Sequence, residues 1–187
     1  MKKCKWTAVM GLIFFLTLAT PAMAAEGSDH MQKMIACAVV GDIQGGEQYA
    51  ARRNEKIRNY SLAYPCCSFE DLYLTAKIIQ AEAGSSWLSN DWQLYVGNVL
   101  LNRVSVEQFP STISGCVYQR GQYYGSRSSR FANLLPTERA ARNAARLLNG
   151  ERFLPKNVVY QSNFKQGSGV HIALSDQYLG TTYFCYH

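Results

Sequence analysis

Residues 68–86, with the sequence SFEDLYLTAKIIQAEAGSS, carry the clearest structural pattern in the chain. Ser68, followed three residues later by Asp71, has the form of an N-terminal capping box. Apolar residues then recur at helical spacing, which predicts an amphipathic helix over residues 69–82. Its apolar positions are Leu72, Ala76, Ile79 and Ala83. A Gly/Ser loop ends this helix and leaves Glu82 in its last turn.

Glu82 is the carboxylate that this pattern singles out. A negative charge is unfavourable at a helix C-terminus, because the macrodipole is negative there, so we expect a raised pKa for Glu82. The apolar neighbours that should favour its neutral form are Ile78, Ile79, Ala81 and Ala83. A carboxyl that holds its proton near neutral pH can donate it to a glycosidic oxygen. The alternative is an exposed acid at a helix end with no chemical role.

The remaining pattern outlines an α+β, mainly helical domain with a small β element. Helices are predicted at residues 91–104, 111–118 and 137–148, and short strands at 158–160 and 182–184. Asn90 is the expected N-cap of the first of these helices, and Gly150 the C-cap glycine of the last. A loop rich in Gly, Ser, Tyr and Arg spans residues 121–130, and a Gly-rich turn region separates the strands.

The N-terminal segment has the composition of a secretory signal peptide. Residues 1–24 begin with three lysines within the first five positions, continue as an apolar run and end in an Ala-Met-Ala triplet. The run is short for a membrane-spanning helix, although an uncleaved anchor is the alternative. We therefore expect secretion, with no integral membrane segment after cleavage. Residues 25–67 are interpreted as an N-terminal extension or linker, and residues 68–187 as one catalytic domain.

Composition argues against several classes of partner. Without residues 1–24 the chain has 16 basic and 13 acidic residues, and this net charge of +3 suits an anionic surface. No basic run or RNA-binding motif indicates nucleic acid, and no Cys/His pair has metal-ligand spacing, so neither a metal nor a cofactor is expected. The remaining cysteines are odd in number, which leaves at least one thiol unpaired within a monomer. They are Cys37, Cys66, Cys67, Cys116 and Cys185.

Several ordered motifs resemble the SleB-like cell-wall hydrolase family, which includes spore-cortex-lytic enzymes. The first three are IIQAEAG at residues 78–84, LLNRV at 100–104 and FPSTI at 109–113. A Gln-aromatic pair, an Ala-rich helix ending in Gly and an aromatic close follow at residues 122–123, 140–150 and 183–185. The resemblance covers roughly residues 70–187, and the ordered set is far more specific than any one motif.

The resemblance implies a lysozyme-like fold of goose or transglycosylase type. It also implies peptidoglycan glycan strands as substrate, from vegetative wall or spore cortex, and Glu82 as the catalytic acid/base. The chain departs from the family pattern at three places. Ser85 or Ser86 replaces the second Glu of the first motif, Thr182 stands where a His is often found, and the loop before Asn102 is about two residues longer.

The missing second carboxylate bears on the mechanism. Glycosidases normally use two carboxylates, and the nearest downstream acid, Asp91, lies at the start of a predicted helix. A lytic transglycosylase, which needs one Glu, is therefore favoured over a hydrolase.

Four further residues are expected to bind substrate. They are Gln122, Tyr123, Asn102 and Tyr160. Each has a structural alternative: a solvated loop for the Gln-Tyr pair, a brace at a helix end for Asn102, and a core position for Tyr160.

Two rival functions remain open from the sequence. Cys66 or Cys67 with His171 would make a cell-wall amidase or peptidase, although no helix N-terminus is evident that would lower the pKa of either thiol. A wall-binding module that has kept the fold but lost catalysis is the other rival.

Overall fold

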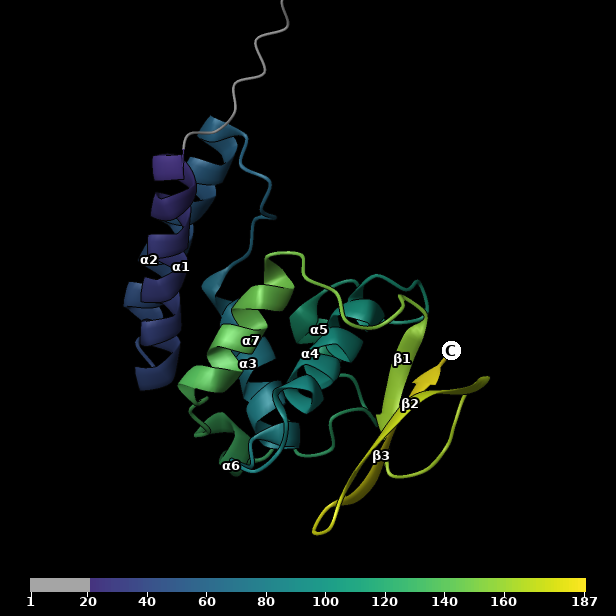
Figure 1. The fold of residues 1–187 in the computed structure, drawn as a ribbon. Helices are drawn as coiled ribbons and strands as arrows, with labels where there is room; N and C mark the ends of the chain where they lie inside the picture. Colours follow the sequence, from purple (N-terminus) through teal and green to yellow (C-terminus); the bar gives the residue numbers. More distant parts are fainter. Residues whose placement is uncertain (1–20) are drawn as a thin grey trace, which may run out of the picture.

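The computed structural model describes residues 21–187 (Figure 1). The predicted signal peptide, residues 1–24, lies almost entirely outside this described part. Within residues 21–187, none of the helices combines the length and the apolar character that a bilayer crossing requires. The order of elements is seven helices followed by three strands, so an α+β, mainly helical fold with a small β element is confirmed.

A central layer of three helices holds most of the core. They are α3 (Phe69–Ala83), α4 (Asn90–Val104) and α7 (Glu138–Leu148). The start of α3 is fixed by the predicted capping box, because the Asp71 amide donates to Ser68 Oγ at 3.0 Å and the Ser68 amide donates to Asp71 Oδ2 at 3.1 Å. Side chains from all three helices are fully buried and form one cluster, among them Leu72, Ile79, Val99, Leu100, Ala144 and Leu147.

The cap predicted for α4 was wrong by one residue. Ser89 is the N-cap, and its Oγ accepts from the Trp92 amide at 3.4 Å. Asn90 is instead the first helical residue, and its Oδ1 accepts a 2.7 Å hydrogen bond from Asn143 of α7. At the end of α7, Gly150 follows the C-cap with φ at +104°, a backbone conformation that favours glycine, as its predicted position implies.

Residues 25–67 contain a helical hairpin that joins the same core. Helix α1 (Pro21–Val40) and helix α2 (Ile43–Tyr60) lie side by side against the central layer (Figure 1). The buried Arg53 of α2 donates from Nη2 to Asn149 Oδ1 at 2.6 Å and from Nη1 to the Pro65 carbonyl at 3.1 Å. A Cβ at Gly46 would lie 2.3 Å from the Phe69 ring, so only glycine allows this close approach. The segment is therefore a docked extension and not a free linker.

The other side of the central layer is covered by a three-stranded antiparallel sheet (Figure 1). Its strands are β1 (Val158–Ser162), β2 (Gly169–Asp176) and β3 (Gly180–Tyr186), in the order β1-β3-β2. The sequence interpretation missed β2 as a strand. Short helices α5 (Ile113–Val117) and α6 (Ser129–Ala132) flank the loop at 118–128, and α6 was also not predicted.

Candidate active site

A cavity of about 530 Å³ opens where α3 ends, beside the loop before α6 and the tip of the β2–β3 hairpin. Side chains from all three segments line it, among them Ile78, Gln80, Glu82, Tyr123, Arg130 and Leu179. Figure 1 shows these segments at the same end of the molecule. Glu82 is the only acid in this lining. No group of three His, Cys, Asp or Glu side chains within residues 21–187 is placed to hold a metal ion.

The end of α3 that carries Glu82 is held from behind by buried amides. Gln93 of α4 donates from Nε2 to the Ala83 carbonyl at 3.0 Å, which satisfies a carbonyl that the helix end leaves open. Asn143 of α7 donates in turn to Gln93 Oε1 at 3.0 Å. The last turn of α3 is thus fixed to both neighbouring helices, and Glu82 has a defined direction into the cavity.

The pKa of Glu82 is raised. Its side chain is open to solvent on the cavity side, but the protein around the carboxyl displaces enough water for desolvation to raise the pKa. The positive charge of Arg103 and a hydrogen bond donated by the Gln161 side chain both favour the carboxylate, yet they do not outweigh this effect. A carboxyl in this state can act as an acid and then as a base.

Arg103 holds the wall behind Glu82. It is buried, and its Nε donates to the Val159 carbonyl of β1 at 2.7 Å. The guanidinium lies over two rings, 5.1 Å from the Tyr123 centroid and 5.5 Å from that of Phe109. Arg103 therefore holds β1 and the loop that carries Tyr123 in place, and it adds a positive charge near Glu82.

Tyr123 lines the cavity from the predicted loop, but its side chain is not surface-like as the sequence indicated. The side chain is only 8% exposed, and its ring is packed against Arg103. Burial raises the pKa of its hydroxyl to about 12; the charge of Arg103 opposes this, and that of Glu82 adds to it. The hydroxyl has no hydrogen-bond partner within the described residues. Tyr123 thus forms part of the cavity wall, with its hydroxyl buried and its ring covered by Arg103, and does not present an exposed stacking face.

Gln161 is a site residue that the sequence interpretation missed. Successive side chains of a strand point to opposite faces, so Gln161 faces Glu82 while Tyr160 faces away. Tyr160 instead stacks on His187, with ring centroids 5.9 Å apart. The alternation of side chains along the predicted strand could have identified Gln161, because it directly follows Tyr160 and therefore points to the opposite face. The Gln161 Oε1 atom is buried and has no hydrogen-bond partner in the described part of the chain.

The other residues predicted to bind substrate lie outside this cavity lining. Asn102 is buried, and its Nδ2 donates to the carbonyls of Pro155 and Val158 at 2.8 Å each. Its polar groups are therefore used to hold the start of β1, which is the structural alternative. Gln122 is half-buried and does not line the cavity. Asp91, considered above as a second carboxylate, is exposed at the start of α4.

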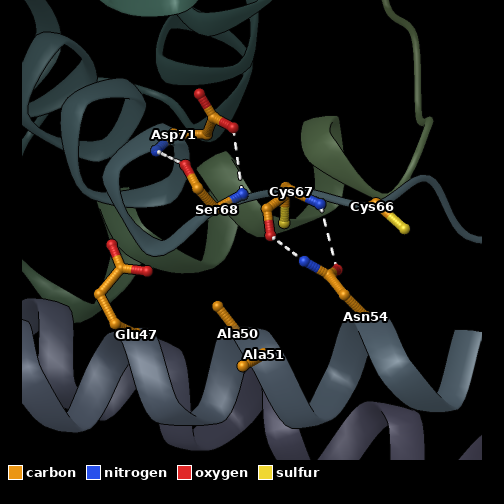
Figure 2. Close-up of a pocket in the computed structure, with 8 residues that line it drawn as sticks. All are labelled: Glu47, Ala50, Ala51, Asn54, Cys66, Cys67, Ser68 and Asp71. Carbon is orange, nitrogen blue, oxygen red and sulfur yellow. Dashed lines mark hydrogen bonds between the residues drawn. The ribbon is translucent and has the colours of Figure 1, made fainter.

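The thiols lie in a different place from His171. Figure 2 shows Cys66 and Cys67 at a hollow between α2 and the start of α3, where Asn54 bonds the Cys67 backbone. Burial raises the pKa of the Cys67 thiol, which disfavours the reactive thiolate. His171 lies on β2, across the helical layer, and its Nδ1 is hydrogen-bonded to the Tyr186 hydroxyl at 2.8 Å. Among residues 21–187, neither Cys66 nor Cys67 lies beside His171, so the pair that the amidase alternative requires is not formed.

The geometry is that of a lone protonatable carboxyl in an open cavity, braced by an arginine and a glutamine. Residues 89–173 match the family model described as Cell Wall Hydrolase. The matched segment contains Arg103, Tyr123 and Gln161, but it begins after Glu82. The match supports the prediction of an enzyme that acts on the cell wall. No curated protein and no solved structure matches the chain, so the lysozyme-like character of the fold stays a prediction.

Proposed function

We propose that this protein cleaves the MurNAc-GlcNAc bond of peptidoglycan as a lytic transglycosylase, with Glu82 as general acid and then general base. The observation that carries the proposal is the raised pKa of the one acid that lines the cavity. The cell wall hydrolase match over residues 89–173 supplies the substrate class. An extracytoplasmic location, as the N-terminal sequence predicts, is part of the proposal.

The two steps use one proton. Protonated Glu82 donates to the glycosidic oxygen as the bond to C1 of the muramoyl residue breaks. The resulting carboxylate then accepts the proton of the muramoyl 6-hydroxyl as that oxygen attacks C1, which leaves an anhydromuramoyl end and restores the acid. Arg103 and Gln161 lie close enough to affect the charge of Glu82, so they stabilise the carboxylate that exists between the steps.

The cavity lining favours this mechanism over hydrolysis. A glycosidase that activates water normally has a second carboxylate across the scissile bond. Asp176, on the hairpin near the cavity, is engaged by the amides of Tyr178 and Leu179 at 2.9 and 3.1 Å, and it does not line the cavity. No acid within the described lining stands opposite Glu82.

The charge of the cavity also suits a muramoyl unit. Arg130 lines it, is exposed, and makes no ion pair with an acid of the described residues. A guanidinium recognises a carboxylate by paired hydrogen bonds, and the lactyl or peptide portion of the muramoyl residue supplies one. This places an anion-binding group in the same cavity as the acid, which suits a substrate that carries a carboxylate.

The test is Glu82→Gln, with Glu70→Gln as a matched control on the same helix. Gln keeps the size of the side chain but cannot donate and regain the proton, so a loss of at least about 100-fold is expected, with the fold intact. Glu70 lies in the first turn of α3 and is exposed, so its variant should retain activity.

Mass spectrometry of the products identifies the reaction. Anhydromuramoyl ends support the proposal, reducing muramoyl ends indicate hydrolysis, and new free amines indicate an amidase. A folded Glu82→Gln protein with wild-type activity contradicts the central role of Glu82.

A further inference from the structure

We infer that Trp87 and the tip of the β2–β3 hairpin form a second saccharide-binding element, which stacks on a sugar of the glycan strand beyond the cleaved bond. The inference rests on the proposed function, because it names the substrate contact at one end of the same cavity. The element consists of Trp87, Tyr178 and Leu179 and is called the aromatic rim here.

The aromatic rim exposes large apolar side chains. Trp87 is 58% exposed and Tyr178 is 73% exposed. Their ring centroids lie 5.8 Å apart at an interplanar angle of 72°, an edge-to-face pair that leaves ring surface open to solvent. Grouped exposed apolar side chains beside a cavity are typical of binding sites.

The hairpin tip is held in place before any ligand binds. Asp176 accepts hydrogen bonds from the amides of Tyr178 and Leu179 at 2.9 and 3.1 Å. The Trp87 side chain donates a further hydrogen bond to Asp176, so one carboxylate joins the hairpin tip to the loop after α3. A fixed pair of rings loses little conformational entropy on binding.

The loop that carries Trp87 is braced from the opposite side by α7. Arg139 donates from Nη2 to the Ser85 carbonyl at 2.9 Å and from Nη1 to the Leu88 carbonyl at 3.0 Å. Leu88 is buried in the core, so the loop is anchored on both sides of Trp87. The rim therefore joins two segments that are far apart in sequence into one firm surface.

Continuity with the cavity identifies the occupant. Leu179 of the rim and Ser85 of the braced loop both line the cavity that contains Glu82. A polymer that places its scissile bond at Glu82 must leave the cavity along one of its edges, and the rim forms such an edge. Pyranose rings present an apolar C–H face, which aromatic rings bind, and polar edges, which stay in water. A sugar unit of the strand fits an exposed, rigid aromatic pair of this kind.

The experiment measures binding separately from cleavage. In the Glu82→Gln background, calorimetry would compare the binding of peptide-free MurNAc-GlcNAc strands of several repeats with that of a single disaccharide. Trp87→Ala or Tyr178→Ala should weaken binding of the long strands by about two- to ten-fold, and leave the disaccharide nearly unaffected. Tyr178→Phe keeps the ring and should retain affinity.

Tyr60→Ala is the matched control. Tyr60 is 50% exposed at the end of α2, a helix that contributes no residue to the cavity lining, and its loss should change neither affinity. Equal affinity of the rim variants and their parent for long strands would overturn the inference. The proposed function fails by a different result, the retention of cleavage by Glu82→Gln, so the two failures are distinguishable.

Discussion

Gln161 offers the sharpest test of how the protein sets the charge of Glu82. Its side chain donates a hydrogen bond to the Glu82 carboxylate, and its Oε1 atom has no partner in the described residues. Gln161→Met keeps the length and removes both polar groups. Because the lost hydrogen bond favours the charged form, the pKa of Glu82 should rise further in this variant.

The magnitude follows from the solvent access of the carboxyl. A neutral hydrogen bond contributes about 0.5–1.5 kcal/mol, and the open cavity side of Glu82 places this one towards the lower end. Loss of positioning should then slow cleavage by about two- to five-fold, the fold-change that corresponds to about 0.5–1 kcal/mol. The rate falls where Glu82 loses its proton, so the alkaline limb of the pH–rate profile should move to higher pH.

The assay is release of soluble muropeptides from purified peptidoglycan across a pH series. Gln166→Met is the control, because Gln166 hydrogen-bonds Ser162 at 3.0 Å and does not line the cavity. An alkaline limb that stays in place, or moves to lower pH, would refute the role given to Gln161.

Three other variants test the site and its support. Tyr123→Phe removes a buried hydroxyl without a described partner, so the free energy of unfolding in urea should be unchanged or rise by up to about 1 kcal/mol. Tyr123→Ala also removes the buried ring and should lower the free energy of unfolding by roughly 3–5 kcal/mol. Asn102→Ala removes the hydrogen-bond donor of two carbonyls and should lower the free energy of unfolding by roughly 2–4 kcal/mol. An unfolding free energy equal to that of the wild type would show that these hydrogen bonds are dispensable. Because the folded-state pKa of Glu82 is raised, its stabilising contribution is present at low pH and lost as pH rises through that pKa. The stability of the wild type relative to Glu82→Gln should therefore fall with rising pH. A difference in melting temperature between the two proteins that stays constant across the pH series would contradict this.

The helices could be predicted because their signals are local. The capping box at Ser68 and the apolar spacing up to Ala83 fix α3 within one turn, and the same reasoning found α7. Strand β2 was missed although half-buried and exposed side chains alternate along it, because Gly167, Gly169 and Gly180 at and around its ends suggested a turn region. The docked position of α1 and α2 depends on long-range contacts such as Arg53 with Asn149, which leave no periodic trace in the sequence.

Of the residues that the sequence proposed for the site, Glu82 and Tyr123 line the cavity. A helix end and apolar neighbours gave the raised pKa of Glu82, and burial is its main cause in the structure. The residues that surround and support Glu82 were harder to predict, because they are brought together by contacts between segments that are far apart in the sequence. Asn102 faces backbone carbonyls of the β1 region, Tyr123 is covered by Arg103, and Gln161 reaches Glu82 from β1. Residue type alone does not distinguish a binding amide from a bracing one.

The docking of the α1–α2 hairpin determines which fragments of this chain should stay folded. Residues 89–173, the segment that the family match recognises, contain neither the helix that carries Glu82 nor the hairpin packed against it. Phe69, which fills the space left by Gly46, is fully buried only while α2 is present. A protease-resistant fragment should thus start before α2, and a shorter one should aggregate through its uncovered apolar face. A survey of genomes by the matched segment alone would detect the supporting wall of the cavity and overlook its acid.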